Sequence, residues 1–461
     1  MSAFSTLSYS LLNRYTLGGS IRFDGSDLFG VDKKYRYLPL YSVSGLWRIS
    51  QEPFMASAKW IDNLVVRASY GLQGNIDKNT SPFLLGNYRI ENILPGGSED
   101  MIDVSGAPNK KLRWEKTHSV NAGFDFAVLN QAINLSVDYY YRKGVDLIGT
   151  QMLPLETGFE MLTVNWASMR NQGVEVALST RNVHTKNFMW TTNFNFAYNN
   201  NKVLKEALRE DALEPGREGY PAGVLFALKT AGLDEEGYPM FQDKDGKAVS
   251  AMEFFKLQEW GFGATDLTAR ERRELYTYVG TADCPYTGGF NNTFTYKAFE
   301  LGVNFSFDFG GKVRSQPTYS IVDFDKGRNT NRDILNRWTP ENTETIFPVL
   351  LSQNERLDEY MWYSNQNEIY RNLDIWIRDL NYVRLQNIRL GYTLPTNFSR
   401  TLGMTSATVA IEGRNLLVFG SSYKNYLDPE TMSNAYATPA PKSVTCLLYT
   451  SPSPRDISGS R

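Results

Sequence analysis

Histidine and cysteine are scarce in this sequence, with two of each among 461 residues. A zinc site of His and Cys ligands would use nearly the whole supply, and Cys284 and Cys446 lie far apart, so no disulfide framework is indicated. The 48 basic and 50 acidic side chains give a net charge of −2, which provides no electrostatic basis for nucleic-acid binding. No stretch approaches about 18 consecutive apolar residues, so the sequence predicts no transmembrane helix.

Catalytic motifs are also missing. No nucleophile elbow, P-loop or HExxH motif occurs, and neither His118 nor His184 has a serine or aspartate partner that the sequence can assign. Asp243 and Asp245 precede Gly246, but the ligand spacing of a calcium loop is not met, and a hairpin turn at Asp245-Gly246 is the better interpretation. We therefore expect neither an enzyme nor a cofactor or metal site.

Aromatic residues, in contrast, are abundant. The chain has 26 Phe, 27 Tyr and 9 Trp, yet its mean hydropathy is only −0.39. This profile is typical of a large β protein rather than of a helical membrane bundle. Residues 1–10 contain neither the basic region nor the apolar core of a signal peptide. Because the chain opens directly into alternating residues, we expect it to be a fragment of a longer protein.

Apolar and polar residues alternate along runs of about ten residues. A strand in a soluble protein usually has about 5–6 residues, whereas a tilted strand that crosses a bilayer needs about 9–11. The pattern therefore predicts a wall with lipid on one side and water on the other. A large soluble β-sandwich would alternate in the same way. In residues 131–142 the apolar face consists of Ile133, Leu135, Val137, Tyr139 and Tyr141.

Connections of a few residues alternate with long ones, the longest being residues 200–287. Short turns on one rim and long loops on the other are typical of an outer-membrane β-barrel, and a sandwich has no reason to sort its loops in this way. We count about thirteen strands. They lie near residues 4–12, 15–24, 37–49, 61–71, 117–128, 131–142, 170–181, 187–199, 288–297, 299–309, 380–394, 406–418 and 442–449.

The odd strand count indicates an incomplete barrel. Bacterial single-chain barrels have even strand numbers. The first strand is followed by a short link, so it runs toward the periplasm, which indicates an odd number of missing upstream strands. About nine more would complete the class of about 22 strands, whose lumen is plugged. The predicted fold is therefore all-β: an incomplete transmembrane antiparallel up-and-down β-barrel with long extracellular loops and short periplasmic turns.

An ordered set of motifs spans nearly the whole chain. With them, the chain resembles the C-terminal barrel portion of SusC/RagA-type TonB-dependent outer-membrane transporters. The motifs mark strand starts, turns and rim positions, and none is catalytic. They are residues 22–26 (RFDGS) with Phe29-Gly30, 42–50 (SVSGLWRIS), 66–75 (VRASYGLQGN), 112–117 (LRWEKT), 170–175 (RNQGVE), 288–297 (GGFNNTFTYK), 382–385 (YVRL), 390–395 (LGYTLP), 414–416 (RNL) and 428–430 (DPE).

The resemblance implies energised import of large nutrients across the outer membrane of a Gram-negative bacterium. Glycan oligosaccharides are the favoured ligands, and peptides are the alternative. It also implies a SusD-like surface lipoprotein and the TonB-ExbB-ExbD complex, which is reached through an N-terminal plug. This chain contains neither the plug nor the N-terminal strands. The competing hypothesis is a soluble β-rich glycan-binding or adhesin module, which would be monodisperse without detergent.

Two regions of the chain are assigned. Residues 1–445 are the C-terminal portion of the barrel. In the family the last strand closes on an aromatic residue, whereas here residues 446–461 (CLLYTSPSPRDISGSR) are Ser-rich, and Pro452 and Pro454 cannot donate ladder hydrogen bonds. We therefore interpret residues 446–461 as a non-native or disordered tail.

The long loops carry the candidate ligand contacts. Flat aromatic rings beside Asn and Asp could stack on sugar rings, and the residues singled out are Trp260, Tyr286, Trp362 and Tyr363. Packing within the loops, or an aromatic girdle at the membrane rim, is the alternative for each of them. Residues 266–280 are predicted to form a capped surface helix, with Arg270, Arg272 and Arg273 on a solvated face.

Overall fold

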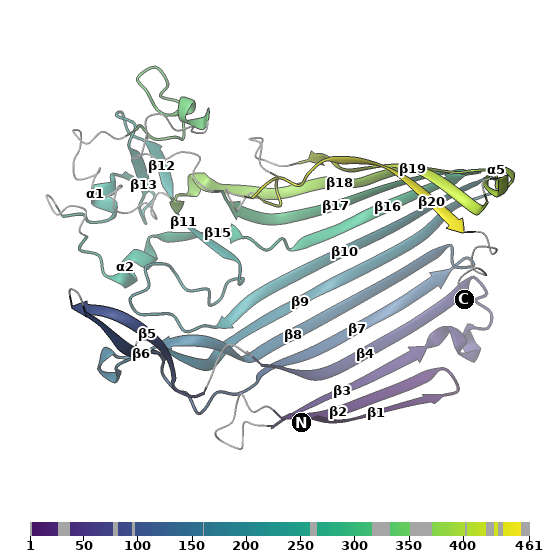
Figure 1. Ribbon diagram of the computed structural model, residues 1–461, viewed down its shortest axis with the longest axis horizontal. Coiled ribbons are helices and arrows are strands. Elements are labelled where there is room, and N and C mark those ends of the chain that lie inside the picture. Colours follow the sequence, from purple (N-terminus) through teal and green to yellow (C-terminus); the bar gives the residue numbers. More distant parts are fainter. Residues whose placement is uncertain are drawn as a thin grey trace.

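One antiparallel sheet of thirteen strands forms the body of the molecule in the computed structural model (Figure 1). The structure describes residues 2–25, 37–76, 82–94, 97–159, 161–258, 265–315, 332–350, 371–401, 403–420, 428–431 and 437–452. The predicted number of strands is confirmed. The strands are β1 (Ser2–Leu11), β2 (Tyr15–Gly25), β3 (Tyr37–Arg48), β4 (Ile61–Asn75), β7 (Glu115–Val128), β8 (Ile133–Met152), β9 (Met161–His184), β10 (Phe188–Lys205), β16 (Tyr286–Tyr296), β17 (Phe299–Arg314), β18 (Ile377–Thr393), β19 (Met404–Phe419) and β20 (Ser443–Pro452).

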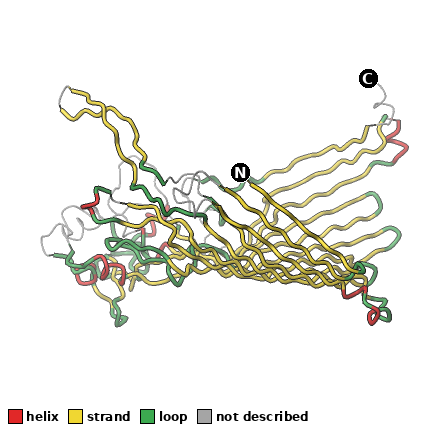
Figure 2. The backbone as a smooth tube through the Cα atoms, turned by 90° about the horizontal axis from the view of Figure 1, so that it is seen from below, coloured by secondary structure: helices red, strands yellow, loops and turns green. Residues whose placement is uncertain are grey.

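Each strand of this sheet pairs with the next one along it, and the sheet does not close, because β1 and β20 are its two edges. Figure 2 shows the result as a curved, open wall. This is the incomplete up-and-down barrel that the sequence predicts. Among the described residues, no helix is both long enough and apolar enough to cross a membrane.

The two rims of the wall differ as predicted. At one rim, here called the short-turn rim, tight turns join neighbouring strands, and L-residues take left-handed backbone angles there, as at Asn13 (φ 55°), Asn130 (φ 55°) and Lys297 (φ 53°). At the long-loop rim the hairpins extend further than the predicted ten residues, and β8 and β9 reach 20 and 24 residues. The extra length arises because these two strands stay paired as far as Met152 and Met161.

The two faces of the sheet differ in chemistry. Phe124, Val137 and Val176 are paired neighbours on β7, β8 and β9, and all three belong to one apolar face. This face leaves large apolar side chains uncovered, as a surface in contact with hydrocarbon does. Exposed members are Leu17, Ile21, Val43, Val66, Val120, Phe124, Tyr139, Leu390, Ile411 and Leu448. We call this the outer face, and the opposite side, which carries the polar residues, the polar face.

The two faces predict a large difference between neighbouring substitutions on β9. Val176→Arg places a cation on the outer face and is expected to destabilise the folded chain by about 2–4 kcal/mol near the bilayer midplane. The matched variant Ala177→Arg points to the polar face and should cost much less. Urea titration of the unfolding free energy in lipid vesicles measures both variants. Equal costs would mean that hydrocarbon does not cover the outer face.

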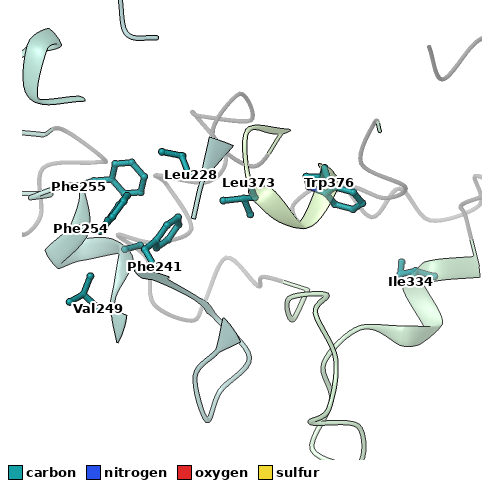
Figure 3. Close-up of a cluster of buried hydrophobic side chains, with 9 residues drawn as sticks. Leu228, Phe241, Val249, Phe254, Phe255, Ile334, Leu373 and Trp376 are labelled. Carbon is teal, nitrogen blue, oxygen red and sulfur yellow. The ribbon is translucent and has the colours of Figure 1, made fainter. Parts of the chain in front are cut away.

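The two longest connections fold together into a small unit at the long-loop rim, on the left of Figure 1. We call it the cap: described residues 206–258, 265–285, 332–350 and 371–376. Its core unites the two connections, with Phe241 and Trp376 almost fully buried (Figure 3). Its elements are β11 (Val224–Leu228), β12 (Thr230–Leu233), β13 (Pro239–Gln242), β14 (Ala248–Val249), α1 (Ala251–Phe254), α2 (Ala269–Glu274), β15 (Tyr276–Thr281), η5 (Arg332–Asn336) and η6 (Asp374–Trp376).

The remaining elements are short. A hairpin of β5 and β6 lies at the long-loop rim, and η2, η3 and α5 lie at the short-turn rim (Figure 1). Their bounds are β5 (Leu85–Leu94), β6 (Gly97–Gly106), η2 (Ile49–Gln51), η3 (Pro53–Met55), η4 (Leu155–Thr157) and α5 (Thr396–Thr401).

The predicted helix over residues 266–280 is too long. The observed helix, α2, begins after Thr268, which makes a capping box with Glu271, and it ends at Glu274. The following residues pair with β11 instead, as strand β15. The solvated arginine face is wrong for Arg273, which donates to the carbonyl oxygens of Glu210 and Ala212 at 2.8 and 2.7 Å.

Two other predictions concern the turn at Asp245-Gly246 and the C-terminal segment. The hairpin turn at Asp245-Gly246 is confirmed, since it joins β13 and β14 and Gly246 has a φ of 80°. Strand β20 pairs with β19 through residues 443–452, so the boundary proposed at residue 446 falls within a strand. Residues 453–461 lie outside the described part, and the assignment of residues 446–461 as a tail stays a prediction.

Candidate functional site

An arginine and two aspartates form an ion-pair cluster on the polar face. Arg67 on β4 donates from Nη2 to Asp138 Oδ2 at 2.7 Å and from Nε to Asp125 Oδ2 at 3.2 Å. Ser136 Oγ also donates to Asp125, at 2.7 Å. The strand register places Gly123 between Arg67 and Asp138, and a Cβ there would collide with the Asp138 carboxylate. Glycine at this position therefore lets the ion pair cross β7.

Two grooves run along the polar face beside this cluster. The first, about 410 Å³, contains the carboxylates of Asp138, Glu175 and Asp308 together with Asn195. The second groove, of about 320 Å³, has hydroxyl and amide groups in its lining, and Arg67 also borders it. Such a lining offers hydrogen bonds to a hydrated polar molecule. The second groove includes Ser8, Thr16, Ser44, Ser69 and Asn121.

A second, buried ion-pair network holds residues 428–431 against the polar face of β18. Arg384 is only 1% exposed; its Nη2 donates to Asp428, and its Nε donates to Glu430 Oε1 at 2.8 Å. The N–H groups of Glu430 and Ala440 also donate to Asp428, at 3.0 and 3.3 Å. We call these contacts the Arg384 anchor. The hydroxyl group of Tyr382, on the same strand, donates to Asp308 and lies 3.2 Å from Glu430 Oε1.

The Arg384 anchor keeps its carboxylate ionised. Burial by itself would raise the pKa of Asp428, but the hydrogen bonds and charge of Arg384 and the two backbone N–H groups outweigh it. The pKa of Asp428 therefore lies below its ordinary value, and the anchor is a charged pair at neutral pH. This anchor joins two of the sequence motifs, residues 382–385 and 428–430, whose contact the sequence did not reveal.

The cap presents an exposed pair of aromatic rings. The ring centroids of Tyr220 and Tyr278 lie 5.2 Å apart, with their planes 29° from parallel. The rings are 37% and 49% exposed, although Phe226 packs edge-on against Tyr220. The pairing of β11 with β15 sets this arrangement, because it places Phe226 opposite Tyr278. Flat exposed rings of this kind suit a ligand with its own flat apolar faces.

The structure places one of the four predicted ligand contacts. Tyr286 begins β16 at the long-loop rim, where the register puts it opposite Tyr198 and Phe309 on the outer face. Its ring stacks on Tyr198 with centroids 5.2 Å apart. This position favours the alternative set beside it, the aromatic girdle. Trp260, Trp362 and Tyr363 lie outside the described residues.

One sequence motif fixes the point, here called the joint, at which a long connection leads into the strands of the wall. In residues 112–117, Leu112 is fully buried and Arg113 pairs with Asp146 at 2.6 Å. Asn165 on β9 locks this joint, because its Oδ1 accepts from Arg113 N–H and its Nδ2 donates to the carbonyl oxygens of Arg113 and Asp146. The sequence did not predict the roles of Asn165 and Tyr220. Each role depends on a contact with a residue distant in sequence, Arg113 for Asn165 and Tyr278 for Tyr220.

Wall, polar face and cap together are part of an incomplete antiparallel β-barrel, and the family comparison agrees. The family described as TonB dependent receptor-like, beta-barrel, matches residues 1–240, and the chain belongs to this family. The resemblance stated from the motifs is thereby confirmed.

The chain is similar to two named TonB-dependent receptors. It is 27% identical over 437 residues to TonB-dependent receptor P3 of Formosa agariphila, and this alignment covers 91% of the chain and 41% of that protein. It is 26% identical over 475 residues to TonB-dependent receptor SusC of Bacteroides thetaiotaomicron, covering 97% of this chain and 43% of SusC. The chain therefore spans about two fifths of the length of these relatives.

A solved structure shares the fold. The RagAB peptide transporter superimposes with a TM-score of 0.77 at 24% sequence identity. The superposition covers 97% of this chain and 47% of that one. At this identity the likeness shows the fold, and it supports the open wall as part of a larger barrel.

Proposed function

We propose that this chain forms part of the wall and cap of an energised importer in the outer membrane of a Gram-negative bacterium. The observation that carries the proposal is the amphipathic wall, which exposes apolar side chains on one face and hydrogen-bonding grooves on the other. A closed barrel of this kind separates hydrocarbon from a hydrated lumen. Membership of the TonB-dependent receptor family supports import and argues against the soluble adhesin module.

The favoured substrates are glycan oligosaccharides. The Tyr220–Tyr278 pair offers two exposed rings on the cap for the apolar faces of sugars, and the groove that includes hydroxyl groups offers hydrogen bonds on the polar face of the wall. Peptides are the second candidate, favoured by the likeness of fold to the RagAB peptide transporter. Trp260, Trp362 and Tyr363 remain proposed contacts for either ligand, whereas the outer-face position of Tyr286 favours the girdle, and the Tyr286→Ala variant decides between the two.

The proposed partners follow from the two rims. A SusD-like surface lipoprotein would meet the cap at the long-loop rim. The TonB-ExbB-ExbD complex would act from the periplasm through a plug in the lumen, where the ionised groups of the polar face would be covered. Outer-membrane lipid would surround the outer face.

A binding experiment tests the substrate surface. The double variant Tyr220→Ala/Tyr278→Ala is expected to weaken oligosaccharide binding about tenfold or more, because truncating a central aromatic contact usually costs more than about 1 kcal/mol. Calorimetry on the detergent-purified protein, with a panel of oligosaccharides and peptides, measures the effect. Loss of peptide binding alone would reverse the preference between the two ligand classes.

Tyr286→Ala is the matched variant, at the same rim but on the outer face. We expect unchanged affinity for every ligand in the panel if its ring belongs to the girdle. A loss of affinity would identify Tyr286 as a ligand contact. Unchanged binding in both the double variant and Tyr286→Ala would remove the cap tyrosines from the proposal.

A further inference from the structure

A polar network crosses the otherwise apolar outer face near the short-turn rim. Thr180 Oγ1 donates to Asn182 Oδ1 at 2.9 Å, and Asn182 Nδ2 donates to Thr192 Oγ1 at 2.7 Å. Thr192 Oγ1 in turn donates to Asn292 Oδ1 at 2.7 Å, and Trp190 Nε1 donates to the same oxygen at 3.0 Å. Four side chains from β9 and β10 are thus linked to one side chain of β16.

The strand register fixes this network on the outer face. Thr180 pairs with Ile133 on one side and Thr192 on the other, and Asn292 pairs with Thr192 and Val303. The row therefore begins and ends with apolar residues. Polar groups in hydrocarbon cost free energy unless they are hydrogen-bonded. Any N–H group of the network that has no partner would therefore be unfavourable on a face that contacts lipid.

The network leaves amide N–H groups that have no partner among the described residues. The Asn182 and Asn292 amide oxygens and the Thr192 hydroxyl oxygen all accept hydrogen bonds within the network. Among the residues that the structure describes, no hydrogen bond from Asn292 Nδ2 is present, and Asn182 Nδ2 uses one of its two N–H groups. A ligand that completes the network must supply acceptor oxygens. Ester carbonyl groups are acceptors without a donor, and they lie at the boundary between headgroup and acyl chain.

The surroundings of the network change in chemistry along the strands from the short-turn rim toward the middle of the wall. Toward the short-turn rim, Lys297 Nζ lies 5.4 Å from the centroid of the outer-face ring of Tyr296. Thr192 follows four residues after the first residue of β10, Phe188, about 14 Å along the strand. Beyond it, Phe194 and Phe290 form the next outer-face pair. From the rim toward the middle of the wall, the cation of Lys297 is therefore followed by aromatic rings, which include the stacked pair Trp190 and Phe294, then by the network amides, and then by the phenyl rings of Phe194 and Phe290.

We propose that the outer face of β9, β10 and β16 binds one glycerophospholipid of the periplasmic leaflet. Lys297 meets its phosphate, Asn182 and Asn292 donate to its ester carbonyl groups, and Phe194 and Phe290 contact an acyl chain. The inference rests on the proposed location of the wall in the outer membrane, and it adds a specific lipid site to that wall.

Native mass spectrometry of the detergent-purified chain tests the site, with phosphatidylglycerol and its diether analogue as probes. The wild-type chain is expected to retain one diester lipid. Asn292→Leu should lower retention about fivefold or more, as expected for loss of a hydrogen bond, and Lys297→Ala should lower it as well. The diether analogue, which lacks the carbonyl groups, should be retained as weakly by the wild type as the diester is by Asn292→Leu.

The control is Asn193→Leu, the same exchange at the residue after Thr192, with its side chain on the polar face. It should retain the lipid as the wild type does. Equal retention by Asn292→Leu and Asn193→Leu, or equal retention of diester and diether lipids, overturns the site. A change of oligomeric mass without loss of lipid overturns it in favour of a protein contact. A chain without β-structure in micelles overturns the membrane wall too, whereas a folded chain that retains no lipid overturns only the site.

Discussion

Replacing Arg384 by methionine is expected to release residues 428–431 from the wall. The variant leaves the Asp428 carboxylate against the sheet without its cation, and breaking a buried ion pair in this way costs about 3–5 kcal/mol. Hydrogen exchange reads the effect directly, because the Glu430 and Ala440 N–H groups donate to Asp428. Their exchange should accelerate more than about a hundredfold.

A matched variant lies on the same strand. Arg389 pairs with Glu300 at 2.8 Å, but both side chains are partly exposed, at 28% and 50%. An exposed pair contributes at most about 1 kcal/mol, so Arg389→Met should leave exchange at Glu430 unchanged. Similar exchange in the two variants would show that other contacts hold the segment and that the Arg384 anchor is incidental.

Phe241→Ala is expected to unfold the cap and leave the wall intact. Phe241 is fully buried, and its ring lies 4.8 Å from that of Phe254 and 5.2 Å from that of Phe255. Truncating a buried phenylalanine costs about 3–5 kcal/mol, which is a large share of the stability of a unit as small as the cap. Limited proteolysis should therefore give new cleavage within the cap, while fragments that contain the wall strands stay protected.

The control for this variant is Leu213→Ala. Leu213 also belongs to the cap but is 46% exposed, so its truncation should leave the cleavage pattern unchanged. Cleavage that spreads into β10 and β16 in Phe241→Ala would contradict independence of the two parts. Cap and wall would then unfold as one cooperative unit.

The wall could be predicted from the sequence because two solvents act on it. Each residue faces either hydrocarbon or water, so alternation along residues 131–142 and its counterparts reports the strand and its faces together. The short turns could also be predicted. Only two residues, Lys297 and Ala298, lie between two alternating runs, so a tight turn is the one connection that fits. Strand ends at the long-loop rim were less predictable, because β8 and β9 continue pairing where neither solvent imposes alternation.

The cap could not be predicted, because its core joins short apolar pieces from two separate connections. Leu228 and Phe241 come from one, and Ile334 and Trp376 from the other. None of these pieces has a periodicity that reveals its partner. Residues 276–280 show the same limit, because local preference extended the helix whereas pairing with β11 made a strand. Tertiary contacts decided the outcome there.

The candidate site divides in the same way. Aromatic residues in the loops were visible in the sequence, but the Tyr220–Tyr278 pair depends on the register between β11 and β15. The motif residues 382–385 and 428–430 were also visible, and the ion pair between them was not, because 44 residues separate Arg384 from Asp428. Charges that meet across such a separation carry no local signal.

The cap has a hydrophobic core of its own, separate from the wall, and this has an evolutionary consequence. A unit whose apolar side chains are satisfied by one another is free to change its surface without disturbing the strands that carry it. Substitutions around Tyr220 and Tyr278 change the exposed surface of the cap, while the strand pairing of the wall stays the same. Related chains can therefore vary the surface of the cap while they keep the same barrel strands.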